Sequence, residues 1–128
     1  MRAADTRTTQ RAIRRIVKGL PWKDAEFVAS MLGCSLVRFA DLVGIPRSTF
    51  FRRRGGRFSP AESDHIMRYA RIWRLAHAAF RSEKAARSWL SRSQHGLDGA
   101  IPLEFAKSEL GARQVETLIT RIQYATAL

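Results

Sequence analysis

The chain has 128 residues, of which 45% are hydrophobic and 27% charged, and its net charge is +12. This length allows one compact domain or two small ones that share a core, and the composition excludes wholesale disorder. Because the charge is strongly positive, we expect a polyanionic partner, of which nucleic acid is the commonest. The charge is concentrated in residues 1–58, which carry 13 Lys and Arg against 4 Asp and Glu.

Several classes of protein are excluded by what the sequence lacks. No apolar run reaches the roughly 20 residues of a membrane span, and no secretory signal is visible at the N-terminus. The single cysteine, Cys34, excludes an intrachain disulfide and fits a reducing compartment. The three histidines lack the spacing of metal ligands, and no catalytic arrangement of carboxylates is present. We therefore expect a cytoplasmic protein that is not an enzyme and that needs no cofactor or metal.

Two helices are predicted before the first glycine-rich turn. Residues 1–10 are polar and small, and we expect a mobile arm there. Residues 11–18 place Ile13, Ile16 and Val17 at helical spacing, with basic side chains on the other side. This basic amphipathic helix either caps the fold as a solvated element or contacts DNA or a partner. A second helix is expected at residues 22–32, with inward-facing Trp22, Phe27, Val28, Met31 and Leu32.

Residues 35–56 have the pattern of a helix-turn-helix. Apolar residues recur at helical spacing in residues 35–43, and Gly44 follows at the position of a sharp turn. Ala40 provides a small residue where the two helices cross, and Phe50 provides an apolar anchor under the second helix. A short helix pair of this kind, followed by four arginines, predicts a DNA-binding element.

The second helix of this pair is rich in arginine. Pro46 suits its first position, and Gly55 and Gly56 permit the left-handed geometry that closes a helix. Outward-facing arginine and serine pair with base edges in the major groove, and arginines at the helix end are better placed for phosphate. The candidate DNA-binding residues are Arg47, Ser48, Thr49, Phe51, Arg52, Arg53, Arg54 and Arg57. Of these, Arg53 stands where a typical helix-turn-helix has an apolar residue.

A long helix is predicted after this element. Residues 59–62 have the form of a capping box with a proline at the first helical position, and the helix extends to about Phe80. One apolar row contains Ile66, Ala70, Trp73, His77 and Phe80, and a second contains Tyr69, Ile72, Leu75 and Ala79. Two rows indicate burial on two sides. The helix therefore joins two units, contributes to a dimer interface, or carries a wide core stripe within one monomer.

Three further helices complete an all-α fold without a convincing strand pattern. Ser82 caps a helix to about Ser91, and residues 94–101 form a turn region. A short helix begins at Pro102 and stops near Gly111. The last helix carries one apolar face, made of Val115, Leu118, Ile119, Ile122 and Ala125.

Three segments of the C-terminal part resemble a known family. Residues 85–90 (AARSWL), 97–104 (LDGAIPLE) and 111–122 (GARQVETLITRI) together resemble the toxin-binding domain of Xre/ParS-type antitoxins. Upstream, residues 44–53 and 57–64 look like that family's Xre helix-turn-helix and the start of its linking helix. The resemblance spans about residues 20–124. It divides the chain into a basic arm or helix (1–20), an Xre-like domain (21–58), a linking helix (59–81) and a toxin-binding or dimerisation domain (82–128).

The resemblance implies the antitoxin of a type II toxin–antitoxin system. Such antitoxins bind a RES-domain toxin, an enzyme that consumes NAD, and they block its active site. The family is also similar to autorepressors, which dimerise and bind the operator DNA of their own operon. The toxin-facing residues that it implies are Trp89, Pro102, Leu103, Phe105, Arg113, Glu116, Arg121 and Tyr124. The alternative is a DNA-binding regulator without a toxin partner, whose C-terminal part only dimerises.

Overall fold

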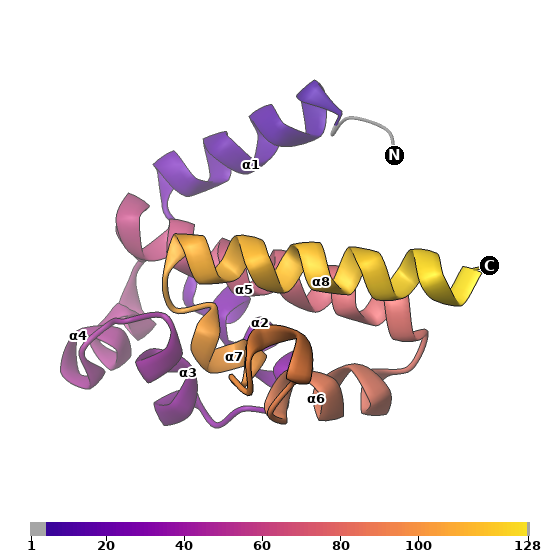
Figure 1. Cartoon of the computed structure of the whole chain (residues 1–128). Coiled ribbons are helices and arrows are strands. Elements are labelled where there is room, and N and C mark those ends of the chain that lie inside the picture. The colour runs from indigo at the N-terminus through magenta and orange to yellow at the C-terminus, as the bar shows by residue number, and fades with distance from the viewer. Residues whose placement is uncertain (1–4, 128) are drawn as a thin grey trace.

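Helix α5 (Pro60–Phe80) lies at the centre of the molecule, and both halves of the chain pack against it (Figure 1). The computed structural model describes residues 5–127, with side chains as far as Ala125. Within this range the fold is all-α, as predicted, and its one β pairing is a single bridge between Pro21 and Arg57. The other elements are α1 (Thr6–Lys18), α2 (Trp22–Leu32), α3 (Leu36–Leu42), α4 (Arg47–Arg52), η1 (Arg53–Gly55), α6 (Glu83–Ser91), η2 (His95–Leu97), α7 (Pro102–Phe105) and α8 (Glu109–Ala127).

The start of α5 confirms the predicted capping box. The Ser59 hydroxyl accepts a hydrogen bond from the Glu62 backbone N–H at 3.1 Å, and the Glu62 carboxylate accepts one from the Ser59 N–H at 2.8 Å. Two backbone donors of the first turn, which no helical carbonyl can reach, are thereby satisfied. Pro60 occupies the first turn, as predicted. This cap fixes where α5 begins and how the preceding segment enters it.

Tyr69 shows how α5 joins the two halves of the chain. Its ring is fully buried and packs edge-on against Phe39 of α3, with the ring centroids 6.2 Å apart. Its hydroxyl donates a hydrogen bond to the backbone carbonyl of Leu103 in α7 at 2.9 Å. One side chain thus contacts the N-terminal unit and the C-terminal unit together. The buried apolar residues form one continuous core around α5. Within the monomer, α5 therefore joins the N-terminal and C-terminal units through a shared core.

Helix α1 differs from the prediction of a mobile arm at residues 1–10. The helix begins at Thr6, and the Asp5 carboxylate caps it by accepting a hydrogen bond from the Arg7 backbone N–H at 3.0 Å. Residues 1–4 of the predicted arm lie outside the described residues. None of the 13 residues of α1 is buried, and Ile13 and Val17 are 53% and 67% exposed. The apolar face of this helix therefore remains open to solvent within one chain.

Two side chains that were predicted to lie on apolar faces are exposed. Phe27 of α2 is 62% exposed, whereas Val28 and Leu32 of the same helix are buried in the core. His77 is likewise exposed, and its ring stacks on the half-buried Trp73 ring with a centroid distance of 5.6 Å. Helical spacing places a residue near the core face but does not tell whether another helix lies above it.

The glycines after α4 also behave differently from the prediction. Gly55 lies in the 3₁₀ turn η1, and Gly56 has a nearly extended φ of −156°. The left-handed position in this region is instead Gly44, with φ of 71°, at the turn between α3 and α4. The turn glycine was therefore predicted correctly, whereas left-handed closure at Gly55 and Gly56 was wrong.

Gly111 was predicted to end a helix, but it lies in the first turn of α8. Helix α7 ends at Phe105, and α8 begins at Glu109. A Cβ atom at position 111 would collide with the backbone carbonyl of Phe105. Glycine is needed here for a close approach of two backbones, which a helix-stop interpretation of the sequence does not anticipate.

Candidate functional site

The second helix of the predicted helix-turn-helix, which would be its recognition helix, is α4. Ala40 and Phe50 are both fully buried beneath it, as predicted for the crossing point and the anchor. With Phe50 anchored in the core, the side chains of Arg47, Ser48 and Arg52 of the same helix are exposed. An exposed helix of this size that carries arginine and serine fits the major groove, where both residue types bind base edges.

An aromatic cluster supports α4 from below. The Trp22 ring lies 5.0 Å from the Phe50 ring, 5.8 Å from the Phe51 ring and 6.1 Å from the Phe58 ring, between centroids. Such contacts compensate for the low intrinsic stability of a helix of six residues. Phe51, one of the candidate DNA-binding residues, is half-buried in this cluster.

Arg54 lies over the aromatic cluster instead of projecting freely. Its guanidinium carbon is 5.3 Å from the Trp22 ring centroid and 5.5 Å from the Phe51 ring centroid, within the range of cation–π attraction. The residue stays exposed, so its outer edge remains open to an anion. The aromatic faces therefore orient Arg54 at the end of α4 without neutralising its charge.

Arg53 is the predicted DNA-binding residue whose position differs most from expectation. Its Nε and Nη2 atoms donate to the two carboxylate oxygens of Glu62, at 2.9 Å each. These hydrogen bonds lower the pKa of Glu62 and raise that of Arg53. A bidentate pair of this kind fixes the side chain and neutralises its charge. The arginine that replaces an apolar residue of the usual helix-turn-helix is therefore a structural tie to α5.

The remaining two candidates lie at the margins of the helix. Thr49 is half-buried. Arg57 is exposed, and its Nη1 atom donates a hydrogen bond to the Gly19 carbonyl at 2.7 Å. Of the eight candidates, Arg47, Ser48, Arg52, Arg54 and Arg57 are thus exposed on and after α4, whereas Thr49, Phe51 and Arg53 are half-buried.

The predicted partner-binding residues fall into two groups. Pro102 and Leu103 are buried, and Trp89 and Phe105 are half-buried, with the Trp89 ring 5.5 Å from the Phe80 ring. Their positions assign them mainly to the core of the C-terminal unit. Glu116 is also engaged, because its carboxylate accepts hydrogen bonds from Arg71 of α5 at 2.8 to 3.1 Å. The other three, Arg113, Arg121 and Tyr124, are exposed on α8.

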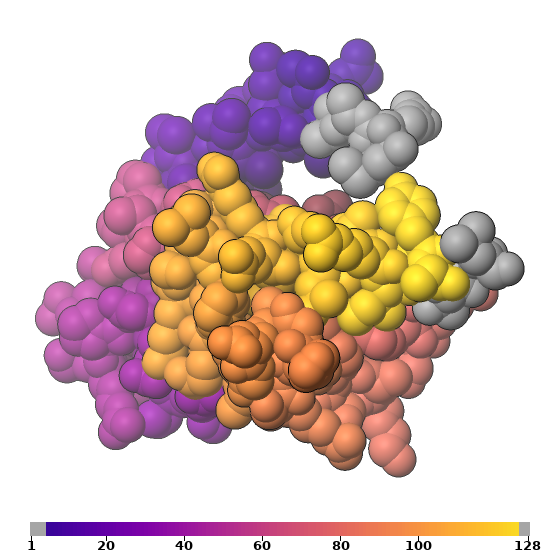
Figure 2. Space-filling model, viewed as in Figure 1, coloured from indigo at the N-terminus to yellow at the C-terminus, as the bar shows by residue number. Residues whose placement is uncertain are grey.

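These three residues belong to a longer exposed row along α8, which we call the α8 stripe. A residue advances 100° around a helix, so positions 3, 4 and 7 apart lie on one face. Leu110, at 77%, is the most exposed of the large hydrophobic residues described. The sequence interpretation missed it because the helix was expected to begin after Gly111. The α8 stripe consists of Leu110, Arg113, Gln114, Thr117, Arg121 and Tyr124, and α8 lies across the near face of the molecule in Figure 2.

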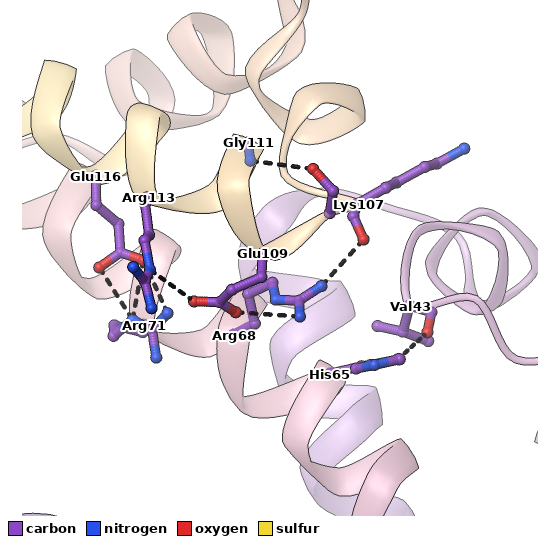
Figure 3. Close-up of polar contacts among 10 residues, drawn as sticks. Val43, His65, Arg68, Arg71, Lys107, Glu109, Gly111, Arg113 and Glu116 are labelled. Atoms are coloured by element: carbon purple, nitrogen blue, oxygen red, sulfur yellow. Dashed lines mark hydrogen bonds and ion pairs between the residues drawn. The ribbon is translucent and has the colours of Figure 1, made fainter.

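Polar contacts join α8 and the loop before it to α5 (Figure 3). Arg68 is almost completely buried, and it donates to the Lys107 carbonyl at 3.0 Å and to the Glu109 carboxylate at 3.2 Å. The Arg71–Glu116 pair lies one turn further along. On the other side of α5, the His65 ring nitrogen is 2.9 Å from the Val43 carbonyl, at the end of α3. The α8 stripe and the recognition helix are thus held on one rigid frame.

Further features of the described part of the chain concern metal ligands, the cysteine and membrane spans. Within residues 5–127 no group of three or more His, Cys, Asp or Glu could hold a metal ion. Burial raises the pKa of the Cys34 thiol, which is the unreactive condition for a cysteine. None of the helices described is long and apolar enough to cross a bilayer. The candidate residues that are exposed lie in two sets, one on and after α4 and one along α8.

Comparisons with known proteins agree with this division. Residues 11–71 match the family described as "Antitoxin Xre-like helix-turn-helix domain", and residues 75–125 match the "Antitoxin Xre/MbcA/ParS C-terminal toxin-binding domain". A curated protein from Yersinia enterocolitica, named "Antitoxin Xre", is 37% identical over 84 residues, which is 63% of this chain and 57% of that protein. A second "Antitoxin Xre", from Pseudomonas putida, is 33% identical over 61 residues, covering 48% and 38% of the two chains. The chain thus spans about half the length of these relatives or less.

Proposed function

Because the chain belongs to the Xre-type antitoxin family, we propose that it is the antitoxin of a type II toxin–antitoxin system. It acts in the cytoplasm, where it binds a RES-domain toxin and thereby prevents that enzyme from degrading NAD. It also binds operator DNA and represses its own operon. The choice of a RES-domain toxin rests on the family resemblance of residues 84–123.

The observation that carries this proposal is the presence of two unlike surfaces on one frame. The exposed side chains on and after α4 are cationic and suit DNA. The α8 stripe mixes Leu110 and Tyr124 with two arginines and amide or hydroxyl groups, a composition typical of protein interfaces, in which aromatic residues and arginine are enriched. An antitoxin that is also a repressor needs both kinds of surface.

The proposal requires a RES-domain protein encoded by an adjacent gene, and coexpression with the product of that gene tests the toxin function. Wild-type protein is expected to restore growth, preserve cellular NAD and copurify with the toxin. The double variant Arg121→Glu/Tyr124→Ala is expected to lose all three effects, because it removes an anchor and reverses a charge on the α8 stripe. A matched control, Lys84→Glu/Arg92→Ala, changes exposed residues outside the stripe. Continued NAD loss in the presence of folded wild-type protein would refute the proposal.

The DNA function is tested with the DNA upstream of the operon. Arg47→Ala is expected to weaken binding by about 1–3 kcal/mol and to relax preference at one base pair, if Arg47 reads a guanine. Arg92→Ala, which removes an exposed arginine from the C-terminal part of the chain, is the matched control. Wild-type protein that binds this DNA no better than unrelated duplex would exclude operator recognition. That result with intact toxin binding would leave an antitoxin without autorepression.

The proposal includes a homodimer, which we place on the N-terminal side of α5. Ile13, Val17 and Phe27 are exposed apolar side chains, and Phe27 borders a cavity of about 400 Å³ between α1, α2 and α5 that also contains Met67 and Trp73. A second copy of the chain, related by a two-fold axis, covers both these exposed side chains and the cavity. Phe27→Ser is expected to shift the sedimentation equilibrium to monomer. If the wild-type protein sediments as a monomer at micromolar concentration, this part is wrong.

The alternative of a regulator without a toxin partner places dimerisation in the C-terminal part. The exposed apolar side chains named above lie instead in the N-terminal part. The α8 stripe, with Leu110 and Tyr124, is assigned to the toxin in this proposal. These observations favour the antitoxin proposal.

A further inference from the structure

Helix α1 has two chemically distinct faces. Its sequence, TRTTQRAIRRIVK, contains no acidic residue. At 100° per residue, Ile13, Ile16 and Val17 lie on one side, and the basic residues gather on the opposite side. We call this side the α1 basic face; it consists of Arg7, Arg11, Arg14, Arg15 and Lys18.

The charges of this face are not used to hold the fold together. All five side chains are exposed. Of these five side chains, only Arg15 forms an ion pair within the part of the chain that the structure describes, with Asp24 of α2. The other four have no carboxylate partner within that part of the chain. Arginines three and four residues apart on a helix repel one another, so an external anion relieves a cost that the free protein carries.

The position of α1 connects this face to the helix-turn-helix. The Arg57 guanidinium donates to the Gly19 carbonyl at 2.7 Å, and the Phe58 N–H donates to the Leu20 carbonyl at 3.0 Å. Arg15, Lys18, Lys23 and Arg57 line one open hollow of about 360 Å³, which lies between the end of α1 and the start of α2. The cations after the recognition helix therefore continue into the α1 basic face.

The length and placement of α1 suit a rod-like polyanion. Its 13 residues extend about 20 Å, at 1.5 Å per residue. Figure 1 shows α1 projecting from the body of the molecule, apart from α8. Duplex DNA carries one negative charge per about 1.7 Å of its axis, so a cationic rod of this length meets several phosphates.

We propose that the α1 basic face binds the phosphate backbone of DNA beside the site contacted by α4, independently of base sequence. This inference rests on the proposed DNA-binding function and adds a second contact to it. The four unpaired cations supply affinity, while α4 supplies sequence preference. With Arg52, Arg54 and Arg57, about seven phosphate contacts result, and these correspond to a slope of log K against log salt near −6.

The test compares two variants, each of which loses four positive charges, but from different parts of the surface. In the first, Arg7, Arg11, Arg14 and Lys18 are each replaced by Gln, which retains helix propensity. In the control, the exposed residues Arg74, Arg81, Lys84 and Arg92 are replaced by Gln. Circular dichroism verifies that both keep the wild-type helix content.

The α1 variant is expected to bind operator duplex with a slope of log K against log salt near −3. Between 50 and 200 mM salt, its affinity should therefore fall by a factor about 100 times smaller than the factor by which the wild-type affinity falls. The control variant is expected to keep a slope within about one unit of wild type. Hydroxyl-radical footprinting should show that the α1 variant loses backbone protection at the flanks and keeps it at the centre.

Failure of the inference differs from failure of the function on which it rests. If wild-type protein binds operator DNA and the α1 variant keeps the wild-type slope and footprint, the inference is wrong and the repressor function stands. If equal losses occur in both variants, the effect comes from net charge alone and the inference is again overturned. If wild-type protein binds no duplex at any salt concentration, the DNA-binding function itself fails.

Discussion

The carboxylate of Glu62 receives two hydrogen bonds from Arg53, at 2.9 Å each, and ties the end of the recognition helix to the first turn of α5. The same carboxylate caps α5 through the Ser59 N–H. One side chain therefore fixes the angle at which α4 leaves the body of the molecule. Replacement of Glu62 should alter DNA binding through geometry, although Glu62 itself repels DNA.

This pair predicts a pH dependence of stability. Arg53 lowers the pKa of Glu62 below the ordinary 4.5, so the carboxylate stabilises the fold fully above that pH. The contribution is lost as the pH falls through the lower folded-state pKa. In urea denaturation the stability difference between wild type and Glu62→Gln should be constant near pH 7 and shrink below about pH 4.5. The shrinkage should disappear in an Arg53→Leu background, and an unchanged difference down to pH 3 contradicts the prediction.

The hydrogen bond between α5 and α7 predicts that removal of one hydroxyl group lowers the free energy of unfolding. Tyr69→Phe removes the hydroxyl that donates to the Leu103 carbonyl and leaves that carbonyl buried without its donor. We expect a loss of about 1–2 kcal/mol in the free energy of unfolding, measured by urea titration. Tyr124→Phe, at a side chain that is 52% exposed, is the matched control and should change it little. Equal effects of the two substitutions would argue against this role of the hydrogen bond.

The close approach at Gly111 predicts strong intolerance to a methyl group. Gly111→Ala places a Cβ against the Phe105 carbonyl, so α7 and α8 must move apart. The expected destabilisation is about 1–3 kcal/mol, which is typical of overpacking. Gly55→Ala provides the control, since nothing lies within 4 Å of the added atom. A wild-type melting temperature for Gly111→Ala would contradict this account.

Leu110 predicts an effect on partner binding without an effect on folding. Because its side chain is 77% exposed, Leu110→Ser should leave the free energy of unfolding within about 0.5 kcal/mol of wild type. Because Leu110 is an apolar anchor at one end of the α8 stripe, the same substitution should lower the affinity for the purified toxin roughly tenfold, measured by calorimetry. Val37→Ser, at an exposed residue of α3 outside the stripe, serves as the control. Unaltered toxin affinity would exclude Leu110 from the interface.

The sequence predicts those features that depend on neighbouring residues along the chain. The Ser59 and Ser82 caps and the Gly44 turn follow from local hydrogen-bonding and backbone preferences, and the structure confirms them. The all-α class follows from helical periodicity in the same way. Capping boxes and turn glycines satisfy backbone groups within a few residues, so no tertiary information is needed to place them.

The features that escape the sequence depend on what lies opposite a residue in space. Phe27 has the spacing of a core residue, but its side chain is 62% exposed in the part of the chain that the structure describes. Arg53 has the composition of a DNA ligand, but Glu62 is within reach after the chain turns. Gly111 has the appearance of a helix stop, but its neighbour is the carbonyl of a separate helix. Each error arises where tertiary contact overrides a local preference.

A single core around α5 has a consequence for turnover in the cell. The helix-turn-helix match ends at residue 71 and the C-terminal match begins at residue 75, so the seam falls inside one continuous helix. A protease that removes α8 uncovers the side of α5 that carries Arg68 and Arg71, which pair with Glu109 and Glu116 of α8, and the loosened remainder becomes a substrate in turn. Neutralisation of the toxin and silencing of the operon should therefore be lost with the same half-life, in one act of degradation.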